Sequence, residues 1–336
     1  MFNDTFIQAC YGKPTPRIPV WFMRQAGRSL PGYRELRKKY DVLTLTQTPE
    51  LAAQVSLEPI QRLGVDAAIL FADIMLLPIA MGKEVKVVDN VGPIVDDPIT
   101  SSEDIQKLRP FEPDNAVYLQ QTVKLLRREL QVPLIGFSAA PFTLASYLIE
   151  GQPTRTWLKT KRFMFEQPEA WAQLMGVLSE AIIAYLSMQI TAGVQAVQIF
   201  DSWVGCLAPS DYRTFVLPHV QKIFLALKGE GVPRIHFGTN TGAMLRDFSN
   251  VDCEVIGVDW RIDVAQAKML IGNKAIQGNL DPAVLLASQE TINSKFDELL
   301  SGLPSRDGFI ANLGHGVLPE TSDKKLTTLV EHIHGK

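Results

Sequence analysis

Cysteine is scarce in this sequence. The three cysteines, Cys10, Cys206 and Cys253, are scattered over 336 residues and form no Cys-x-x-Cys pair. Their odd number and wide spacing argue against a disulfide framework and against a zinc site built on cysteine pairs. The chain also lacks a G-x-G-x-x-G sequence and a P-loop, so nucleotide binding has no support.

Charge of one sign is not in large excess either. The formal net charge is −3 and charged residues make up 21% of the chain, which argues against non-specific binding to nucleic acid or to an anionic membrane. No apolar run approaches the ~20 residues needed to span a bilayer. Residues 1–13 lack the basic-then-apolar pattern of a signal peptide. We therefore expect a cytoplasmic protein with no nucleic-acid or membrane partner.

What the sequence does contain is an alternation of two patterns. Short apolar runs rich in β-branched and aromatic residues alternate with longer amphipathic stretches. Eight such runs favour an α/β fold of the TIM (β/α)8 barrel type over an open, doubly wound sheet with fewer strands. The predicted strands are Pro19–Met23, Ala67–Phe71, Pro133–Ser138, Val194–Phe200, Arg234–Phe237, Glu254–Asp259, Lys274–Gly278 and Gly308–Leu313.

Helix signals stand between these strands. Thr48, Pro49 and Glu50 combine a cap residue, a first-turn proline and an acidic residue at the positive end of a helix. Two further helices are predicted from Pro168 to Ala192 and from Ser210 to Lys228.

The interval between the second and third predicted strands is long. Within it, residues 82–97 alternate like a β-hairpin with its turn at Asp89-Asn90 or Asn90-Val91-Gly92. We interpret this hairpin as part of an insertion after strand two, within a single domain that spans residues 1–336.

Residues 17–39 form a basic segment in a slightly acidic chain, with seven basic residues and one acidic residue. Arg24 and Arg28 stand where the first predicted strand ends, and Gly27 between them permits a tight, irregular backbone. The planar fork of arginine pairs bidentately with carboxylates and phosphates. The segment therefore predicts a binding site for an anionic ligand.

Polar and aromatic residues follow the other predicted strands, where a TIM barrel has its active site. Asp73 is a candidate cap, but Pro78 argues against a helix there, and we interpret Asp73 as a carboxylate that faces the arginines. His315 lies between two glycines, which leaves its imidazole accessible and favours a functional role. The remaining strand-end residues of interest are Tyr147, Asp201, Ser202, Trp203, His236, Asp259, Trp260 and Arg261.

Several of these residues also fit structural roles. His236 fits a core position as well as a functional one. Asp201 and Asp259 are typical of acceptors for backbone amides in neighbouring loops. Thr143 fits a cap or turn better than a nucleophile, and the G-x-S-x-G frame of a nucleophile elbow fails at Ala140.

Six segments, in order over almost the whole chain, resemble uroporphyrinogen decarboxylases. They are Pro19–Arg28, Gly136–Gly151, Phe200–Trp203, Gly257–Arg261, Gln277–Pro282 and Asn312–Pro319. The resemblance implies a cytosolic, homodimeric TIM barrel that removes carbon dioxide from the four acetate side chains of uroporphyrinogen III. The product is coproporphyrinogen III, in tetrapyrrole (haem) biosynthesis, and this carboxy-lyase uses no cofactor and no metal.

The resemblance also assigns roles to residues. Asp73 matches an aspartate that faces the centre of the macrocycle and stabilises the transition state. The proton donor is left open among Arg24, Arg28, Tyr147 and His315, which with Asp73 are the predicted catalytic residues. The predicted substrate-binding residues are Arg24, Gln25, Ala26, Gly27, Arg28, Asp73, Tyr147, Ser202 and His315.

Two other functions fit parts of the sequence. A methyltransferase of the same superfamily would bind zinc through a His-x-Cys pair and a distant cysteine. Here His236 is followed two residues later by Gly238, and Cys253 alone does not complete such a site. A non-catalytic tetrapyrrole- or polyanion-binding protein would keep the arginines but tolerate the loss of Asp73 and Tyr147. Since both are present, we expect the decarboxylase.

Overall fold

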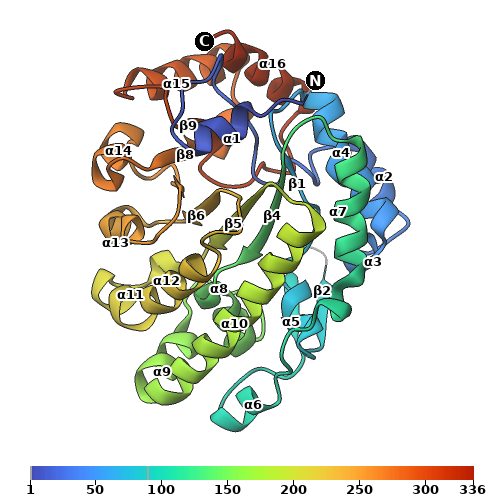
Figure 1. Cartoon of the computed structure of the whole chain (residues 1–336), viewed down its shortest axis with the longest axis vertical. Helices are drawn as coiled ribbons and strands as arrows, with labels where there is room; N and C mark the ends of the chain where they lie inside the picture. Colours follow the sequence, from blue (N-terminus) through green and yellow to red (C-terminus); the bar gives the residue numbers. More distant parts are fainter. Residues whose placement is uncertain (1, 89–90) are drawn as a thin grey trace.

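The computed structural model describes residues 2–88 and 91–336. Within them, a seven-stranded sheet has the order β1-β4-β5-β6-β7-β8-β9, and β2 and β3 form a separate pair. All neighbours in the larger sheet are parallel, and helices surround it (Figure 1). The strands of the larger sheet are β1 (Ala68–Ile69), β4 (Leu134–Ala139), β5 (Ala196–Asp201), β6 (Arg234–Gly238), β7 (Val255–Gly257), β8 (Ala275–Leu280) and β9 (Phe309–Leu313).

The segment of residues 18–23 connects the two edges of this sheet. Val20 forms a parallel bridge with Ala311 of β9, and its carbonyl accepts the N–H of Asp66, just before β1, at 2.8 Å. The sheet is therefore curled, and the α/β fold is consistent with a TIM-like barrel.

Seven of the eight predicted strands correspond to strands of this sheet, but Pro19–Met23 forms only the bridge at Val20. Apart from Trp21, whose N–H donates to the carbonyl of Ala311 at 3.3 Å, its backbone donors have other uses. Pro19 has no N–H, the N–H of Val20 donates to a carboxylate oxygen of Asp66 at 2.9 Å, and that of Met23 donates to the side chain of Asn312 at 3.0 Å. Side chains thus take the positions that a strand partner would occupy.

Sixteen α-helices lie among the described residues. The predicted helix at residues 48–50 is confirmed as α4 (Pro49–Leu63), which has proline in its first turn and ends at Gly64 with φ 72°. The other helices are α1 (Thr5–Cys10), α2 (Pro31–Arg37), α3 (Val42–Gln47), α5 (Leu76–Ala80), α6 (Ser102–Gln106), α7 (Val117–Glu129), α8 (Pro141–Glu150), α9 (Leu158–Glu166), α10 (Pro168–Ala192), α11 (Pro209–Phe215), α12 (Leu217–Ala226), α13 (Leu245–Ser249), α14 (Val264–Ile271), α15 (Gln289–Ser301) and α16 (Asp323–His334).

Two predicted helices differ in outcome. The one from Pro168 to Ala192 is confirmed as α10. The one from Ser210 to Lys228 is divided into α11 and α12, because Val216 between them leaves the helical conformation, with φ −127° and ψ −50°.

Helix α10 is long and apolar enough to cross a membrane by length and composition. The expectation that no apolar run approaches this length is therefore wrong for residues 168–192. Of the most apolar part of α10, 56% is buried inside the molecule. The helix packs against α7, α8, α9 and α12, and these several neighbours explain why more than one of its faces is apolar.

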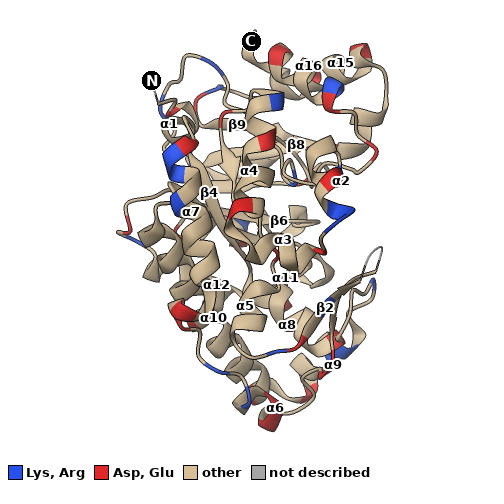
Figure 2. Cartoon of the chain, turned by 90° about the vertical axis from the view of Figure 1, so that its right-hand side faces the viewer, with Lys and Arg blue, Asp and Glu red and all other residues tan. Residues whose placement is uncertain are grey.

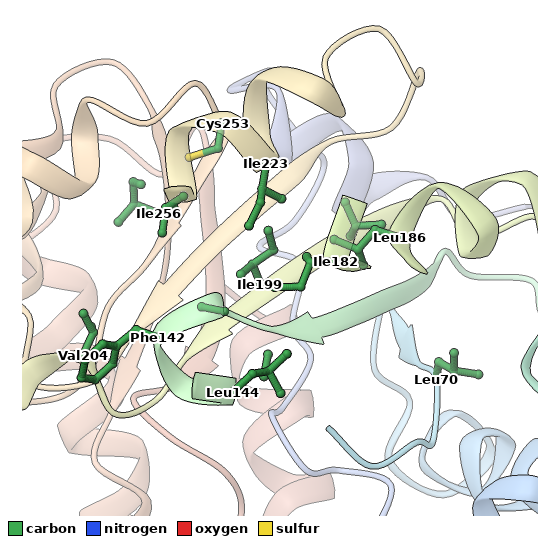
Figure 3. Packing of buried hydrophobic residues seen from close by; sticks show 14 of the residues in the cluster. Leu70, Phe142, Leu144, Ile182, Leu186, Ile199, Val204, Ile223, Cys253 and Ile256 are labelled. Atoms are coloured by element: carbon green, nitrogen blue, oxygen red, sulfur yellow. The ribbon is translucent and has the colours of Figure 1, made fainter. Parts of the chain in front are cut away.

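The two larger clusters of buried apolar residues lie outside the curled sheet and within it, and a smaller third cluster includes Tyr33 and Phe71. Ile199 of β5 and Ile182 and Leu186 of α10 belong to the outer cluster, between strand and helix (Figure 3). Ile235 and Phe237 of β6 belong to the inner cluster, together with Phe6 of α1. Since neighbouring residues of a strand point to opposite faces, both faces of the sheet are packed.

The predicted hairpin is observed as the antiparallel pair β2 (Val85–Val88) and β3 (Gly92–Val95), in which Val85 pairs with Val95 and Val88 with Gly92. The two alternative turns, at Asp89-Asn90 or Asn90-Val91-Gly92, include residues outside the described ranges.

In the view of Figure 2, basic and acidic residues are interspersed along the helices.

Candidate active site

The loop that carries Arg24 and Arg28 is held from within by Gln25. The Gln25 side chain is fully buried, its Oε1 accepts the N–H of Phe22 at 2.9 Å, and its Nε2 donates to the carbonyl of Ala67 at 2.9 Å. Because backbone groups bind both the oxygen and the nitrogen of this amide, the Gln25 side chain fixes the shape of the loop.

Arg24 has a left-handed backbone, with φ 61°. We expected the irregular backbone at Gly27, but Gly27 has no positive φ and instead lies close to the carbonyl oxygen of Arg24, which a Cβ would approach to 3.2 Å. A left-handed conformation is costly for a residue with a Cβ and is typical of functional positions. The backbone strain in this loop is therefore at Arg24, which favours a functional role for this residue.

The side chain of Arg24 lies against Gly316, where an added Cβ would overlap it. Arg24 as a whole is exposed to solvent, although many protein atoms surround its guanidinium. Burial lowers the pKa of Arg24, and the nearby charge of Arg28 lowers it further. Tyr147 and Asp73 act in the opposite direction and raise the pKa of Arg24. These interactions bring four of the predicted site residues within electrostatic range of one another.

Asp73 is half-buried and lies three positions before the start of α5. Its Oδ1 accepts the N–H of Met75 at 2.8 Å, and among the described residues its Oδ2 receives no hydrogen bond. The expectation that Pro78 prevents a helix here is wrong, because Pro78 lies in the first turn of α5, where no N–H is needed. Burial raises the pKa of Asp73, while the Met75 N–H and the charge of Arg24 oppose the rise.

Tyr147 lies on α8 and stacks on Trp203, with ring centroids 3.9 Å apart and planes at 27°. Burial, with a contribution from the charge of Asp73, raises the pKa of Tyr147 to about 12. The phenol is therefore protonated at neutral pH and available as a hydrogen-bond donor.

Asp201 fastens α8 to the end of β5. The hydroxyl of Thr143 donates to Oδ1 of Asp201 at 2.9 Å and accepts the N–H of Trp203 at 3.4 Å. Asp201 thus accepts a hydroxyl, not the backbone amide that we expected. Its Oδ2 is buried without a partner among the described residues, and burial raises the pKa of Asp201 to about 7.

A cavity of about 390 Å³ opens where β5, β6, β7 and β9 end, and it includes the predicted residues Ser202 and His315. Trp157 and Asn240, which also line it, have left-handed backbones with φ 50° and 56°. Together with Arg24, they are the non-glycine residues with positive φ in the described part of the chain. The lining residues are Trp157, Ser202, Trp203, Gly205, Cys206, Thr239, Asn240, Trp260, Arg261 and His315.

His315 is less open than its two glycine neighbours suggest. A Cβ on Gly314 would overlap the backbone of Trp260, and one on Gly316 would overlap Arg24, so both glycines permit close packing. Burial, with the charges of Arg24 and Arg261, lowers the pKa of His315 to about 4. The imidazole is therefore neutral at pH 7 in the free protein.

Two open assignments are resolved by packing. His236 is fully buried, stacks on Phe248 with centroids 4.1 Å apart, and has a pKa lowered by burial to about 3, so it is a core residue. Asp259 accepts the backbone N–H groups of Asn240 at 2.7 Å and Arg261 at 3.3 Å, as expected of a loop acceptor.

The predicted catalytic and substrate-binding residues did not include three aromatic and cationic residues that line the cavity: Trp157, Trp260 and Arg261. Trp260 and Arg261 stood at a predicted strand end, which was a usable signal. Trp157 lies between α8 and α9 and follows no strand, so only the tertiary structure brings it to the cavity.

Metal-ligating side chains are not gathered at this site. In residues 2–88 and 91–336, no group of three or more His, Cys, Asp or Glu residues is arranged to hold a metal ion. The groups that do meet are guanidinium, carboxylate, phenol and imidazole, which suit the binding and protonation of a polycarboxylate.

Comparison with solved structures supports the fold. A structure described as a methyltransferase from Methanosarcina mazei superposes with a TM-score of 0.79 at 20% identity, over 98% of this chain and 97% of that chain. A putative vitamin-B12-independent methionine synthase from Listeria monocytogenes superposes with a TM-score of 0.57 at 13% identity, over 97% of each chain. At these identities the likeness concerns the fold alone.

Comparison of sequences is more specific. A sequence model described as "Uroporphyrinogen decarboxylase (URO-D)" matches residues 1–335. Proteins named uroporphyrinogen decarboxylase from Carboxydothermus hydrogenoformans and Bacillus subtilis are 48% and 47% identical to this chain, over 99% of it and over 96% and 95% of their own lengths. One from Thermus thermophilus is 46% identical over 99% of this chain and 98% of its own. The chain belongs to the uroporphyrinogen decarboxylase family.

Proposed function

We propose that this chain is a carboxy-lyase that converts uroporphyrinogen III to coproporphyrinogen III by removing carbon dioxide from four acetate side chains. Membership of the family supports the reaction and its tetrapyrrole substrate. The observation that carries the proposal within the structure is the meeting of Arg24 with Arg28, Asp73 and Tyr147.

The substrate suits this arrangement of charge. It carries eight carboxylates around a ring with four pyrrole N–H groups, so it needs cations near its rim and an acceptor near its centre. Arg24 and Arg28 supply cations, and the free Oδ2 of Asp73 supplies an acceptor. Ser202 and His315, in the adjoining cavity, add polar contacts, while Gln25, Ala26 and Gly27 give the loop its shape.

The chemistry needs no external electron sink. Protonation of the pyrrole α-carbon next to the carbon that bears the acetate makes the ring a cation. The bond to the carboxylate then breaks, its electron pair forms an exocyclic methylene, and carbon dioxide leaves. A second proton converts the methylene to a methyl group, and the ring carbon loses the first proton. One proton is consumed for each carbon dioxide released.

Asp73 is the group that stabilises the cation in this proposal. A charge placed in advance in a partly dry site is usually the largest catalytic term. The charge of Arg24 opposes the rise in the pKa of Asp73 that burial causes, and so favours the ionised form.

The proton donor is an arginine or Tyr147 rather than a charged His315 in the free enzyme. The pKa of His315 is lowered to about 4, so its imidazole carries no extra proton at pH 7. Arg24 is always protonated at that pH, and burial lowers its pKa. We therefore assign delivery of the ring proton to Arg24, directly or through water, and anchoring of the reacting acetate to Arg28.

The proposal also covers the domain organisation, the location and the oligomeric state of the protein. Residues 1–336 form one (β/α)8 barrel domain in which residues 18–23 take the place of the first strand, and β2 and β3 belong to an insertion after β1. We propose that the protein works in the cytoplasm as a homodimer and without nucleic-acid or membrane partners.

The test is anaerobic incubation of the purified protein, treated with a chelator, with uroporphyrinogen III, followed by oxidation and chromatography of the porphyrins. Stepwise appearance of seven-, six-, five- and four-carboxylate products without added cofactor is the expected result. Unchanged octacarboxylate that still binds tightly would instead support a tetrapyrrole-binding protein.

A further inference from the structure

Arg261 follows β7 and is anchored on a buried carboxylate. Its Nη1 lies 2.5 Å from Oδ2 of Asp259, whose side chain is 1% exposed. Asp259 is held in turn by the N–H of Asn240 at 2.7 Å. The backbone of the neighbouring strand end therefore positions the acceptor, and the acceptor positions the guanidinium.

A second contact fixes the plane of the guanidinium. Its central carbon lies 4.0 Å from the centroid of the Trp260 ring, at cation–π distance. A guanidinium held by both an ion pair and a stacking contact loses little further freedom when a ligand binds, which favours affinity.

One edge of the Arg261 fork remains available. Its Nε and Nη2 make no hydrogen bond with the described residues, whereas Nη1 is used by Asp259. The side chain is 48% exposed and lines the cavity together with Ser202 and His315. The free edge is of the kind that binds a carboxylate bidentately.

The surroundings are also positive. Arg24 and Arg261 both lower the pKa of His315, so the imidazole lies within electrostatic range of both arginines. The cationic part of the site therefore extends from the loop after residue 23 to the end of β7.

We infer that Arg261 binds a carboxylate of the tetrapyrrole rim through its Nε and Nη2 edge, as a third cation beside Arg24 and Arg28. The inference rests on the proposed function and adds a specificity-determining residue to it. Two arginines on one loop leave most of the eight carboxylates without a cationic partner, and Arg261 is the fixed, half-exposed arginine that lines the cavity.

The experiment measures anaerobic steady-state kinetics with uroporphyrinogen III for the wild type, Arg261→Gln, Arg261→Lys and the control Arg213→Gln. Arg213 is a matched control because it is 54% exposed and its Nη1 pairs with Oδ2 of Asp247 at 3.0 Å, but it does not line the cavity. We expect Arg261→Gln to raise KM roughly tenfold with kcat within about twofold, the loss of one charge-assisted contact. Arg213→Gln leaves both constants unchanged.

Two further readouts separate binding from folding. Arg261→Lys keeps a positive charge beside Asp259 but lacks the bidentate fork, so its KM falls between those of the wild type and Arg261→Gln. The KM of Arg261→Gln also depends less on ionic strength, because one ligand-binding cation is gone. If Arg261→Gln fails to fold, the KM and salt dependence of Arg261→Lys decide the question.

A wild-type KM and salt dependence in both Arg261 variants would overturn the inference while leaving the decarboxylase intact. A wild-type protein without decarboxylase activity would overturn the proposed function instead. The two failures are therefore distinguishable in one set of assays.

Discussion

The amino and carboxyl ends of the parallel sheet differ in how far their charged residues are paired. At the amino end, the Nε and Nη2 groups of Arg234 donate to Glu254 at 3.1 and 2.7 Å. Asp66 accepts from Arg17 at 2.6 Å, from the N–H of Val20 at 2.9 Å, and lies 2.7 Å from His334. Opposite charges are paired there, and the pairs hold distant segments together.

At the carboxyl end, Asp259 and Arg261 also form an ion pair, but like charges meet and some polar atoms are left without partners. Arg28 lowers the pKa of Arg24, one oxygen of Asp73 receives no hydrogen bond, and Oδ2 of Asp201 is buried alone, all within the described residues. Arg24, Trp157 and Asn240 add backbone strain. The difference teaches that charged residues at the amino end stabilise the fold, whereas the carboxyl end leaves unsatisfied groups with which a ligand can pair.

The largest expected effect comes from removing the charge of Asp73. In Asp73→Asn, kcat falls roughly 100- to 1,000-fold while substrate binding is largely kept, because the developing ring cation loses its counter-charge. Steady-state kinetics and equilibrium binding check this. The control is Asp281→Asn, since Oδ1 of Asp281 accepts the N–H of Ala283 at 2.9 Å in the same local geometry. Near-normal turnover of Asp73→Asn would refute the electrostatic role.

The amino end responds in stability instead of activity. Asp66→Ala leaves its donors unpaired and lowers the free energy of unfolding by about 3 kcal/mol, with kcat/KM unchanged in the folded fraction. Burial raises the pKa of Asp66, but hydrogen bonds from His334 and Arg17 outweigh it and leave the pKa lowered. In the wild type this contribution is therefore present above about pH 4 and is lost as the pH falls through the folded-state value. Denaturation curves at several pH values test both parts; a loss of kcat with unchanged stability would contradict the comparison.

The titration of Asp201, at the carboxyl end, makes the stability of the protein depend on pH in the opposite direction to Asp66. Its pKa is about 7 in the folded protein and 3.8 as the unperturbed value, so the folded state binds more protons and stability falls as the pH rises between these values. Asp201→Asn keeps an acceptor for Thr143 and abolishes this titration. We expect the wild type to lose roughly 2 kcal/mol relative to Asp201→Asn between pH 4 and 6. If the free energy of unfolding of the two proteins changed in parallel with pH, a titrating Asp201 would be excluded.

The smallest expected effect is at Gly316. A methyl group there displaces the side chain of Arg24, so Gly316→Ala raises KM roughly fivefold with little change in the unfolding midpoint. Gly176→Ala is the matched control, because a Cβ at Gly176 of α10 meets no atom within 4 Å. Equal KM values in the two variants would show that the position of Arg24 does not depend on Gly316.

Local pattern was sufficient for much of the fold. Seven strands, α4 and α10 lie where apolar runs, caps and prolines predict them. The strand-like segment at residues 19–23 was mispredicted because side chains from elsewhere take its backbone donors; Met23 and Asn312 are 289 positions apart. No local pattern contains such a partner.

The same limit applies to the site. Strand ends indicated Asp73, Tyr147, Ser202 and His315, and the resemblance gave them roles that stay predictions. The burial of Gln25 and the strain at Arg24 depend on the carbonyl of Ala67, the side chain of Asn312 and the packing around them. Side-chain roles in a loop are set by its packing, which residue type alone does not specify.

By itself, the sequence determined the alternation of strands and helices, the excess of arginine after residue 17 and the family, because periodicity, composition and motif order are properties of the chain. Only the tertiary structure decided the ionisation of the site. The pKa of His315 is low and that of Tyr147 high because burial and charges from distant segments surround them. Desolvation and Coulomb interaction depend on distances in space, and those arise only when the sheet is curled and its ends are brought together.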